Sequence, residues 1–323
     1  MKQTCIVGVL AAAALGVAGS AVAQDYPARP IRVIVPFAAG GPGDVQVRLV
    51  GQKLTEALGQ TVIVDNRGGA NSIVGTELVA KAAPDGYTVL MVTAGYTVNV
   101  TLYPKLPYDS LKDLAPLTLM TKGPAIVVVH PSLPAKNIRE LIAVAKARPG
   151  QLVFASSGTG SPSQLAVELF QIETGTRMIH VPYKGMAPGM TDLLAGQVQL
   201  AFPTIVAGVP LVQAGKLRAL AVTGAQRTPA VPTVPTVAEA GVPGYEATNW
   251  YGLLVPGATP APVVAKLNTE LNRILRLPDV SERLLGLGMD PAPTATPQEF
   301  GTLIRGEITK WAKVVKTSGV KPE

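Results

Sequence analysis

The chain has 323 residues, a net charge of +7 and only 5% aromatic residues. Its basic residues are scattered and no aromatic residues alternate with them, so nucleic-acid binding has little support. The length is enough for two domains, and the mild positive charge would help to attract small anions.

Residues 1–23 have the three-part pattern of a cleaved secretory signal. Lys2 precedes an apolar stretch, and Ala21-Val22-Ala23 provides a small-residue cleavage site. The apolar stretch is shorter than the roughly 20 residues that span a bilayer. Cys5 is the only cysteine and would leave with the signal. We therefore expect a periplasmic protein without disulfides or thiol chemistry.

Apolar, β-branched runs alternate along the chain with helical patterns, which predicts an α/β protein with mostly parallel sheets. The strands are expected at Ile31–Pro36, Thr61–Val64, Thr88–Val92, Ala125–Val129, Leu152–Ala155, Val198–Ala201 and Leu217–Val222. The helices are expected at Asp44–Leu58, Ile138–Ala147, Ser163–Thr174, Pro188–Ala195, Pro262–Leu275 and Pro297–Lys316. Leu267, Leu271 and Leu275 recur at four-residue spacing and should form the core face of their helix.

A glycine-rich turn, Pro36-Phe-Ala-Ala-Gly-Gly-Pro-Gly-Asp44, links the first predicted strand to the first predicted helix. The free N–H groups and the dipole at the start of such a helix favour an anion. The turn has no lysine, unlike a P-loop, so a carboxylate suits it better than a nucleotide. A purely structural interpretation stays open, in which the glycines serve only the turn and Asp44 only caps the helix.

A second candidate anion site is the stretch from Ser156 to Gln164, where Ser161 or Ser163 could cap the following helix. Here too the serines could do no more than cap and turn. Other polar stretches, Thr93–Thr97 with Asn99 and Pro203-Thr204, also follow predicted strands. Because ligands of open α/β sheets lie beyond the carboxyl ends of strands, these stretches predict one cleft between two lobes.

The sequence offers no convincing catalytic or metal-binding group of residues. His130 and His180 are the only histidines and have no carboxylate pattern near them, so no zinc site is expected. The stretch Ser157–Ser161 does not match the G-x-S-x-G motif of serine hydrolases. We expect neither an enzyme nor a cofactor, with a secreted hydrolase using Ser157 or Ser161 and a histidine as a less favoured alternative.

Short motifs follow one another in a specific order along the chain, between Tyr26 and Gly319. They are Pro36-Phe-Ala-Ala-Gly-Gly41 with Asp44, Pro84-Asp-Gly-Tyr-Thr88, Leu106-Pro-Tyr-Asp109, Ala155-Ser-Ser-Gly-Thr-Gly-Ser161, Val181-Pro-Tyr-Lys-Gly185, Gly215-Lys-Leu-Arg-Ala-Leu-Ala-Val222 and Pro235-Thr-Val-Ala-Glu-Ala-Gly241. In their order and spacing they resemble the motifs of the extracytoplasmic solute receptors of tripartite tricarboxylate transporters, the Bug-type receptors.

This resemblance implies a two-lobed type II periplasmic binding protein with two interlobe crossings and a helical C-terminal tail. Lobe 1 would comprise residues 24–122 and 224–323, and lobe 2 residues 123–223, with hinges near Lys122-Gly123 and Thr223-Gly224. The receptor would be a monomer that binds a small organic carboxylate and passes it to the permease subunits of the transporter. A sensor role, in which the closed receptor docks on a histidine kinase, is the alternative.

The resemblance also implies which residues line the site and what the ligand lacks. Family members commonly have histidine at the position of Gln164 and often aspartate where Pro203-Thr204 stands. Without that carboxylate, a ligand ammonium group loses its natural partner, so we expect a di- or tricarboxylate without an amine. The expected ligand-binding residues are Phe37, Ala39, Gly40, Asp44, Thr93, Asn99, Ser157, Thr159, Ser161, Gln164 and Thr204.

Overall fold

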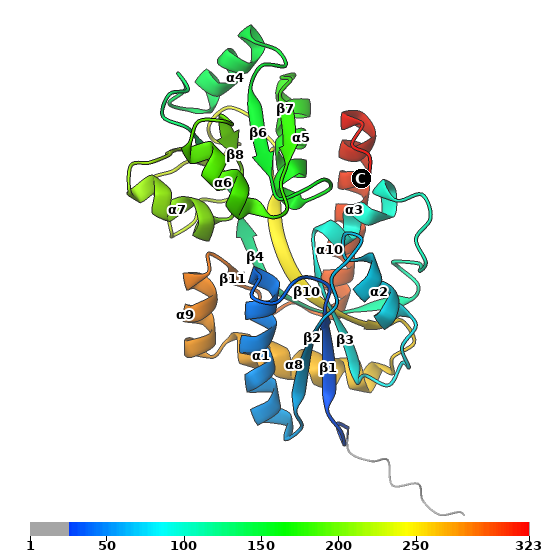
Figure 1. Cartoon of the computed structure of the whole chain (residues 1–323). Coiled ribbons are helices and arrows are strands. Elements are labelled where there is room, and N and C mark those ends of the chain that lie inside the picture. Colours follow the sequence, from blue (N-terminus) through cyan, green and yellow to red (C-terminus); the bar gives the residue numbers. More distant parts are fainter. Residues whose placement is uncertain (1–25, 323) are drawn as a thin grey trace, which may run out of the picture.

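The computed structural model describes residues 26–322, which form two α/β lobes joined by long strands (Figure 1). The predicted signal peptide at 1–23 lies outside the described residues. No helix within residues 26–322 has the length and apolar character to cross a membrane.

The sheet of lobe 1 has the strand order β11-β4-β10-β3-β1-β2. Strand β1 pairs in parallel with β2 and β3, whereas β10 runs antiparallel to β3 and β4, and β11 runs antiparallel to β4. The sheet is therefore mixed and not mostly parallel as expected. Its strands are β1 (Ile31–Val35), β2 (Val62–Asn66), β3 (Thr88–Thr93), β4 (Leu114–Pro124), β10 (Thr248–Pro256) and β11 (Asp290–Pro291).

The sheet of lobe 2 has the order β7-β6-β8-β5-β9 and is also mixed. Strand β6 is parallel to β7 and β8, and β5 is antiparallel to β8 and β9. Its strands are β5 (Ile126–Val129), β6 (Val153–Ser156), β7 (Ile179–Pro182), β8 (Leu200–Ala201) and β9 (Arg218–Val222).

Helices cover both faces of each sheet, and several begin at the capping residues that the sequence provides. Asn137 accepts a hydrogen bond from the Glu140 amide, and Thr296 and Glu299 form a reciprocal capping box. The helices of lobe 1 are α1 (Pro42–Leu58), α2 (Ile73–Ala80), α3 (Gly95–Leu102), α8 (Ala261–Leu275), α9 (Pro278–Gly286) and α10 (Pro297–Ser318). Those of lobe 2 are α4 (Ile138–Ala147), α5 (Pro162–Thr174), α6 (Met186–Leu194) and α7 (Ile205–Gln213).

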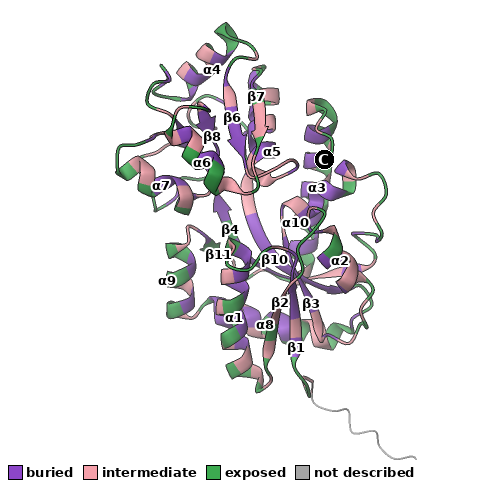
Figure 2. Ribbon diagram, viewed as in Figure 1, coloured by how far each residue is buried: buried purple, intermediate pink, exposed green. Residues whose placement is uncertain are grey.

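Apolar side chains fill the layers between the sheets and their helices, and many strand residues are coloured as buried in Figure 2. Alternate residues of β1 face opposite sides of the sheet: Val33 packs toward α1 and α8, and Ile34 packs toward α2 and α10. The predicted core face of α8 is confirmed, since Leu267, Leu271 and Leu275 are each 1% exposed.

The chain crosses between the lobes twice, and Thr223 connects the two crossings. The first crossing lies between β4 and β5, at Ala125. The fully buried Thr223 hydroxyl accepts a hydrogen bond from the Ala125 amide (2.8 Å) and donates one to the Ala247 carbonyl (2.8 Å). This buried threonine therefore fixes the two crossing segments relative to each other.

The second crossing comes later than residue 224, where the sequence placed the return to lobe 1. The Val237 amide donates to the Val222 carbonyl at the edge of the lobe 2 sheet, and the Tyr245 hydroxyl donates to the Ala166 carbonyl in α5. Val237, Val242 and Tyr245 are buried in the lobe 2 core. Residues 224–247 thus pack with lobe 2, and the return runs through β10, which begins at Thr248.

Helix α10 lies beside α3 of lobe 1 (Figure 1) and also contacts α5 of lobe 2, so it spans both lobes. Phe300 and Ile304, in its first half, pack in the core of lobe 1. Trp311 and Val314, in its second half, belong to an apolar cluster that contains Phe170 of α5. The two lobes are therefore joined by a shared apolar seam as well as by the crossing strands.

Candidate functional site

The loop between β1 and α1 lies at the carboxyl end of a central parallel strand, where the sequence placed a ligand site. Gly40 has a φ of 80°, which favours glycine, and Pro42 begins the helix. Gly43 lies against the core, since a Cβ there would lie 2.1 Å from Met91 Cε. The cap position is Gly41, so no side chain caps α1. Its first N–H groups are thus left for water or a ligand.

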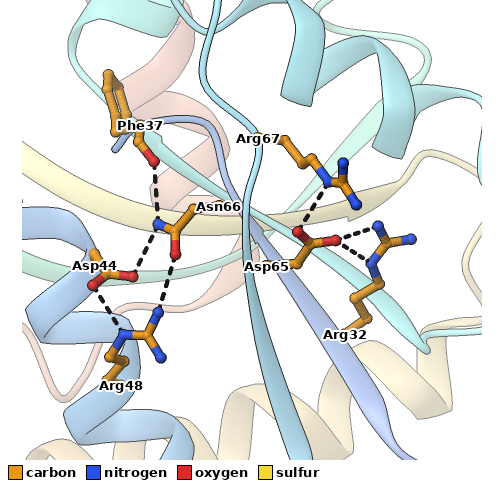
Figure 3. Close-up of polar contacts among 7 residues, drawn as sticks. All are labelled: Arg32, Phe37, Asp44, Arg48, Asp65, Asn66 and Arg67. Carbon is orange, nitrogen blue, oxygen red and sulfur yellow. Dashed lines mark hydrogen bonds and ion pairs between the residues drawn. The ribbon is translucent and has the colours of Figure 1, made fainter. Parts of the chain in front are cut away.

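Asp44, in the first turn of α1, holds this loop in place (Figure 3). Its carboxylate accepts hydrogen bonds from the Gly40 amide, Arg48 Nε and Asn66 Nδ2, each at 2.9 Å. Asn66, at the end of β2, also donates to the Phe37 carbonyl (3.1 Å). Asp44 is only 2% exposed and is not the helix cap that the structural alternative proposed.

Burial of Asp44 would raise the pKa of its carboxyl, but its hydrogen bonds outweigh that effect. The Arg48 side chain, the Gly40 amide and Asn66 together hold the pKa of the Asp44 carboxyl below its usual value. Both carboxylate oxygens accept hydrogen bonds from these groups. Asp44 therefore fixes the shape of the β1–α1 loop, and Arg48 balances its charge.

Thr93 and Asn99 follow β3, the neighbouring strand. Thr93 is partly exposed, and its hydroxyl accepts from the Gly95 amide (3.3 Å). Asn99 is fully buried and exchanges two hydrogen bonds with Asn71: its Nδ2 donates to the Asn71 carbonyl (2.7 Å), and its Oδ1 accepts from Asn71 Nδ2 (2.8 Å). The buried Asn99 side chain thus holds Asn71, in the loop before α2, in place.

The loop between β6 and α5 forms the corresponding part of lobe 2. Ser161 caps α5 by accepting from the Gln164 amide (3.4 Å), so this serine has the capping role that the sequence allowed. The Ser163 hydroxyl accepts from the Ser157 amide (3.0 Å) and lies within hydrogen-bonding distance of the Ser157 and Ser161 hydroxyls. Ser157, Thr159 and Ser161 are partly exposed along this loop.

Gln164 lies beneath the same loop and is 3% exposed. Its Oε1 accepts from the Gly160 amide (2.7 Å), and its side chain hydrogen bonds with Glu168. Burial raises the pKa of the Glu168 carboxyl, and the hydrogen bonds from Gln164 and Gln171 oppose that rise. Gln164 supports the loop from inside the lobe.

Thr204, at the start of α7, is partly exposed.

Residues 68–72, which are not among the predicted site residues, lie between the loops of the two lobes. A Cβ at Gly68 would lie 3.7 Å from the Phe37 backbone, and one at Gly160 would lie 3.3 Å from Asn71 Nδ2. Ala70, Asn71 and Ser72 all have positive φ values of 44°, 49° and 72°. Three such non-glycine residues in a row are rare and are typical of functional loops.

His180 pairs with Ser156, a serine other than the two named in the hydrolase alternative. His180 Nε2 lies 2.6 Å from the Ser156 hydroxyl, and the ring stacks on Phe154. Ser156 is fully buried, and its hydroxyl also accepts from the Gly158 amide (3.1 Å), so it supports the loop. His130 contacts Ser132 on the surface. Within residues 26–322, no group of His, Cys, Asp and Glu side chains is suited to a metal ion.

The sequence matches the profile of the tripartite tricarboxylate transporter family receptor over residues 46–320. BugT of Bordetella pertussis is 39% identical over 322 residues, which cover 99% of this chain and 98% of that protein. A protein of Pseudomonas sp. strain P51, from the tcbD-tcbE intergenic region, is 39% identical over 291 residues, covering 90% and 86%.

Solved structures agree with these relatives. An R. palustris protein with adipate is 38% identical, with a TM-score of 0.82 over 93% of this chain and all of that one. The periplasmic binding protein BugD is 35% identical, with a TM-score of 0.79, covering 92% and 100%. MatC from Rhodopseudomonas palustris with bound malate is 35% identical, with a TM-score of 0.78, covering 90% and 100%. The expected two-lobed periplasmic binding protein fold is confirmed.

Proposed function

Because the chain belongs to the receptor family of tripartite tricarboxylate transporters, we propose that this periplasmic solute receptor captures a small organic dicarboxylate or tricarboxylate without an amine. The ligand would lie between the β1–α1 loop of lobe 1 and the β6–α5 loop of lobe 2. The lobes would close around it and the receptor would deliver it to the permease subunits of the transporter.

The observation that carries this proposal is the uncapped start of α1 at the carboxyl end of β1, opposite a serine-rich loop from the other lobe. An uncapped 17-residue helix presents N–H groups and the positive end of its dipole, which together favour a carboxylate. Ser157, Thr159 and Ser161 would add hydroxyl donors from lobe 2. Two structural neighbours hold adipate and malate, both carboxylates.

The state of Asp44 supports a ligand without an amine. A ligand ammonium group needs an anionic or strongly accepting partner inside the site, since burying it unpaired is costly. The Asp44 carboxylate already accepts from Gly40, Arg48 and Asn66, and the resemblance implies that Pro203-Thr204 stands where family members often have aspartate. Amino acids would therefore bind weakly compared with the corresponding acids.

A thermal-shift screen tests the ligand class. The protein is refolded from denaturant to remove carried ligand and is then screened against adipate, malate, citrate, glutamate and aspartate. A ligand at about 100 times its Kd adds roughly 2.7 kcal/mol of stability, enough to raise the Tm by several degrees. We expect a shift with one class of carboxylate and none with glutamate or aspartate. Tight amino-acid binding in calorimetry would refute the proposed ligand class.

Delivery to a permease requires its own experiment. Membranes that contain the permease subunits of a tripartite tricarboxylate transporter from the same cell are incubated with immobilised receptor, with and without the acid that the screen identifies. Retention of the permease that depends on that acid would support transport. Ligand-dependent retention of a histidine kinase in place of the permease would assign the receptor to signalling.

A further inference from the structure

Two glycines, one from each lobe, lie directly against the opposite lobe. Gly160 belongs to the β6–α5 loop of lobe 2, and Gly288 lies between α9 and β11 of lobe 1. Both have left-handed backbones, with φ values of 73° and 67°. At each position the space that a side chain would need is occupied by residues of the other lobe.

Gly160 faces the end of α3 and the loop before α2. A Cβ at this position would lie 2.6 Å from Leu102 Cδ2 and 3.3 Å from Asn71 Nδ2. Neither neighbour can yield easily, because Leu102 is 3% exposed within the interlobe apolar cluster and Asn71 is held by two hydrogen bonds with Asn99. A contact shorter than 3.0 Å requires something to move.

Gly288 makes the corresponding approach from lobe 1, on the side of α7. A Cβ there would lie 2.8 Å from Ile205 Cβ and 3.3 Å from Val206 Cγ2. Ile205 is 3% exposed, and its Cβ is fixed to the backbone of α7. The obstructing atom therefore cannot be moved by a change of rotamer.

Backbone conformation alone does not explain these contacts. Gly175, at the end of α5, and Gly59, at the end of α1, have φ values of 63° and 66°, and a Cβ on either would meet no atom within 4 Å. They need glycine only for the left-handed conformation. Gly160 and Gly288 share that conformation but also require the absence of a side chain for the lobes to meet.

We propose that the interlobe arrangement of this structure is the closed one and that Gly160 and Gly288 are closure contacts, since a side chain at either position would collide with the other lobe. The inference rests on the proposed function, in which closure traps the ligand. Gly160 belongs to the loop proposed to hold the carboxylate, and Gln164 fixes its amide from within lobe 2. A methyl group at residue 160 would thus hold that loop away from lobe 1, so the ligand would be gripped by one lobe only.

The first test compares alanine variants that share the backbone cost but not the interlobe obstruction. Gly160→Ala is paired with Gly175→Ala in lobe 2, and Gly288→Ala with Gly59→Ala in lobe 1. Titration calorimetry with the acid identified in the screen should show a loss of affinity of about 10- to 100-fold for the first member of each pair. The controls should bind like the parent. Equal losses within a pair would overturn the proposal.

A second readout measures closure itself. In a Cys5→Ser background, Ala57→Cys on α1 and Ala147→Cys on α4 place spin labels on exposed sites of the two lobes. Distances between the labels are measured with and without adipate. Gly160→Ala should shift the distribution toward longer distances than Gly175→Ala in at least one condition. Identical distributions in both conditions would refute the closure contact.

These readouts separate the closure contact from the proposed function. If no acid binds, the proposed function fails, yet a longer distance in ligand-free Gly160→Ala still supports the contact. Leu102→Ala provides a rescue, since it removes the Cδ2 atom that a methyl group at residue 160 would meet. The double variant Gly160→Ala with Leu102→Ala should regain the short distances of the Leu102→Ala variant alone. Failure of this rescue would place the effect in the backbone of residue 160 and overturn the steric explanation.

Discussion

Replacing Asp44 by alanine should loosen the β1–α1 loop, lower the free energy of unfolding and reduce the affinity for the ligand. The substitution removes the acceptor of three hydrogen bonds, from Gly40, Arg48 and Asn66. Hydrogen bonds to a charged group each contribute about 1.5–3 kcal/mol. Gly40 is exposed and Arg48 is half-exposed, so both can turn to water. We therefore expect the variant to lose only about 2 kcal/mol of unfolding free energy.

Equilibrium unfolding in urea at pH 7 measures this loss, which corresponds to a decrease in Tm of roughly 3 °C. Calorimetry with the acid identified in the screen measures binding, for which we expect about tenfold weaker affinity because the loop has lost its support. The variant should keep its fold, as judged by circular dichroism.

The contribution of Asp44 should depend on pH with a defined sign. The folded state holds the pKa of its carboxyl below the unfolded value, which is about 3.9. Stability from the carboxylate is therefore complete above that pH and is lost as the pH falls through the lower folded pKa. The difference between parent and Asp44→Ala should stay constant from neutral pH to about 4 and shrink below it.

Asp65→Asn is the matched control, because the Asp65 carboxylate on β2 pairs with Arg32 and Arg67, apart from the Asp44 group (Figure 3). Hydrogen bonds from Arg32 and Arg67 hold the pKa of the Asp65 carboxyl low in the same way. This control should lose stability and keep its affinity. If Asp44→Ala matched the parent in both stability and affinity, the positioning role of Asp44 would be refuted.

Three further substitutions test other contacts. Gln164→Leu leaves the Gly160 amide without its buried acceptor. It should lower the free energy of unfolding in urea by about 1–3 kcal/mol and weaken ligand binding. Unchanged affinity would show that Gln164 does not support the ligand site. Thr223→Val keeps the shape of the side chain but removes its hydrogen bonds with Ala125 and Ala247. The free energy of unfolding should therefore fall by about 2 kcal/mol. An unaltered urea midpoint would contradict this prediction. Thr296→Ala removes the α10 cap and should cost about 1 kcal/mol without a change in affinity; a binding defect would show that α10 acts on the site.

Strongly patterned elements were predictable from the sequence, and elements that connect the lobes were not. Helix α4 has the predicted bounds, Ile138–Ala147, because its amphipathic pattern and its Asn137 cap agree. Strand β4, from Leu114 to Pro124, was missed, since it contains Pro116 and the polar Lys122 and lacks a regular alternation. Its conformation is imposed by pairing with β10 over nine residues, a contact between segments more than 100 residues apart.

The glycine-rich loops of the candidate site were also predictable, whereas their supporting contacts were not. Arg48 lies four residues after Asp44, so that ion pair follows from helical spacing. Asn66 reaches Asp44 only because β1 and β2 pair in the register that places Val35 opposite Asn66. The crowding at Gly160 arises from Leu102, which belongs to another lobe and whose position no local pattern specifies. Direct ligand contact by the predicted residues stays a prediction.

Trp311, in the apolar seam between α10 and lobe 2, provides an intrinsic fluorescence signal that reports on the arrangement of the lobes. The chain has two tryptophans: Trp250, which packs against Phe300 within lobe 1, and Trp311, which lies in the interlobe cluster. The Trp311 indole N–H donates to Glu307 (2.7 Å), so its emission depends on both a carboxylate and the packing of α5. In a Trp250→Phe background, intrinsic fluorescence would therefore follow the separation of the lobes in unlabelled protein, in real time.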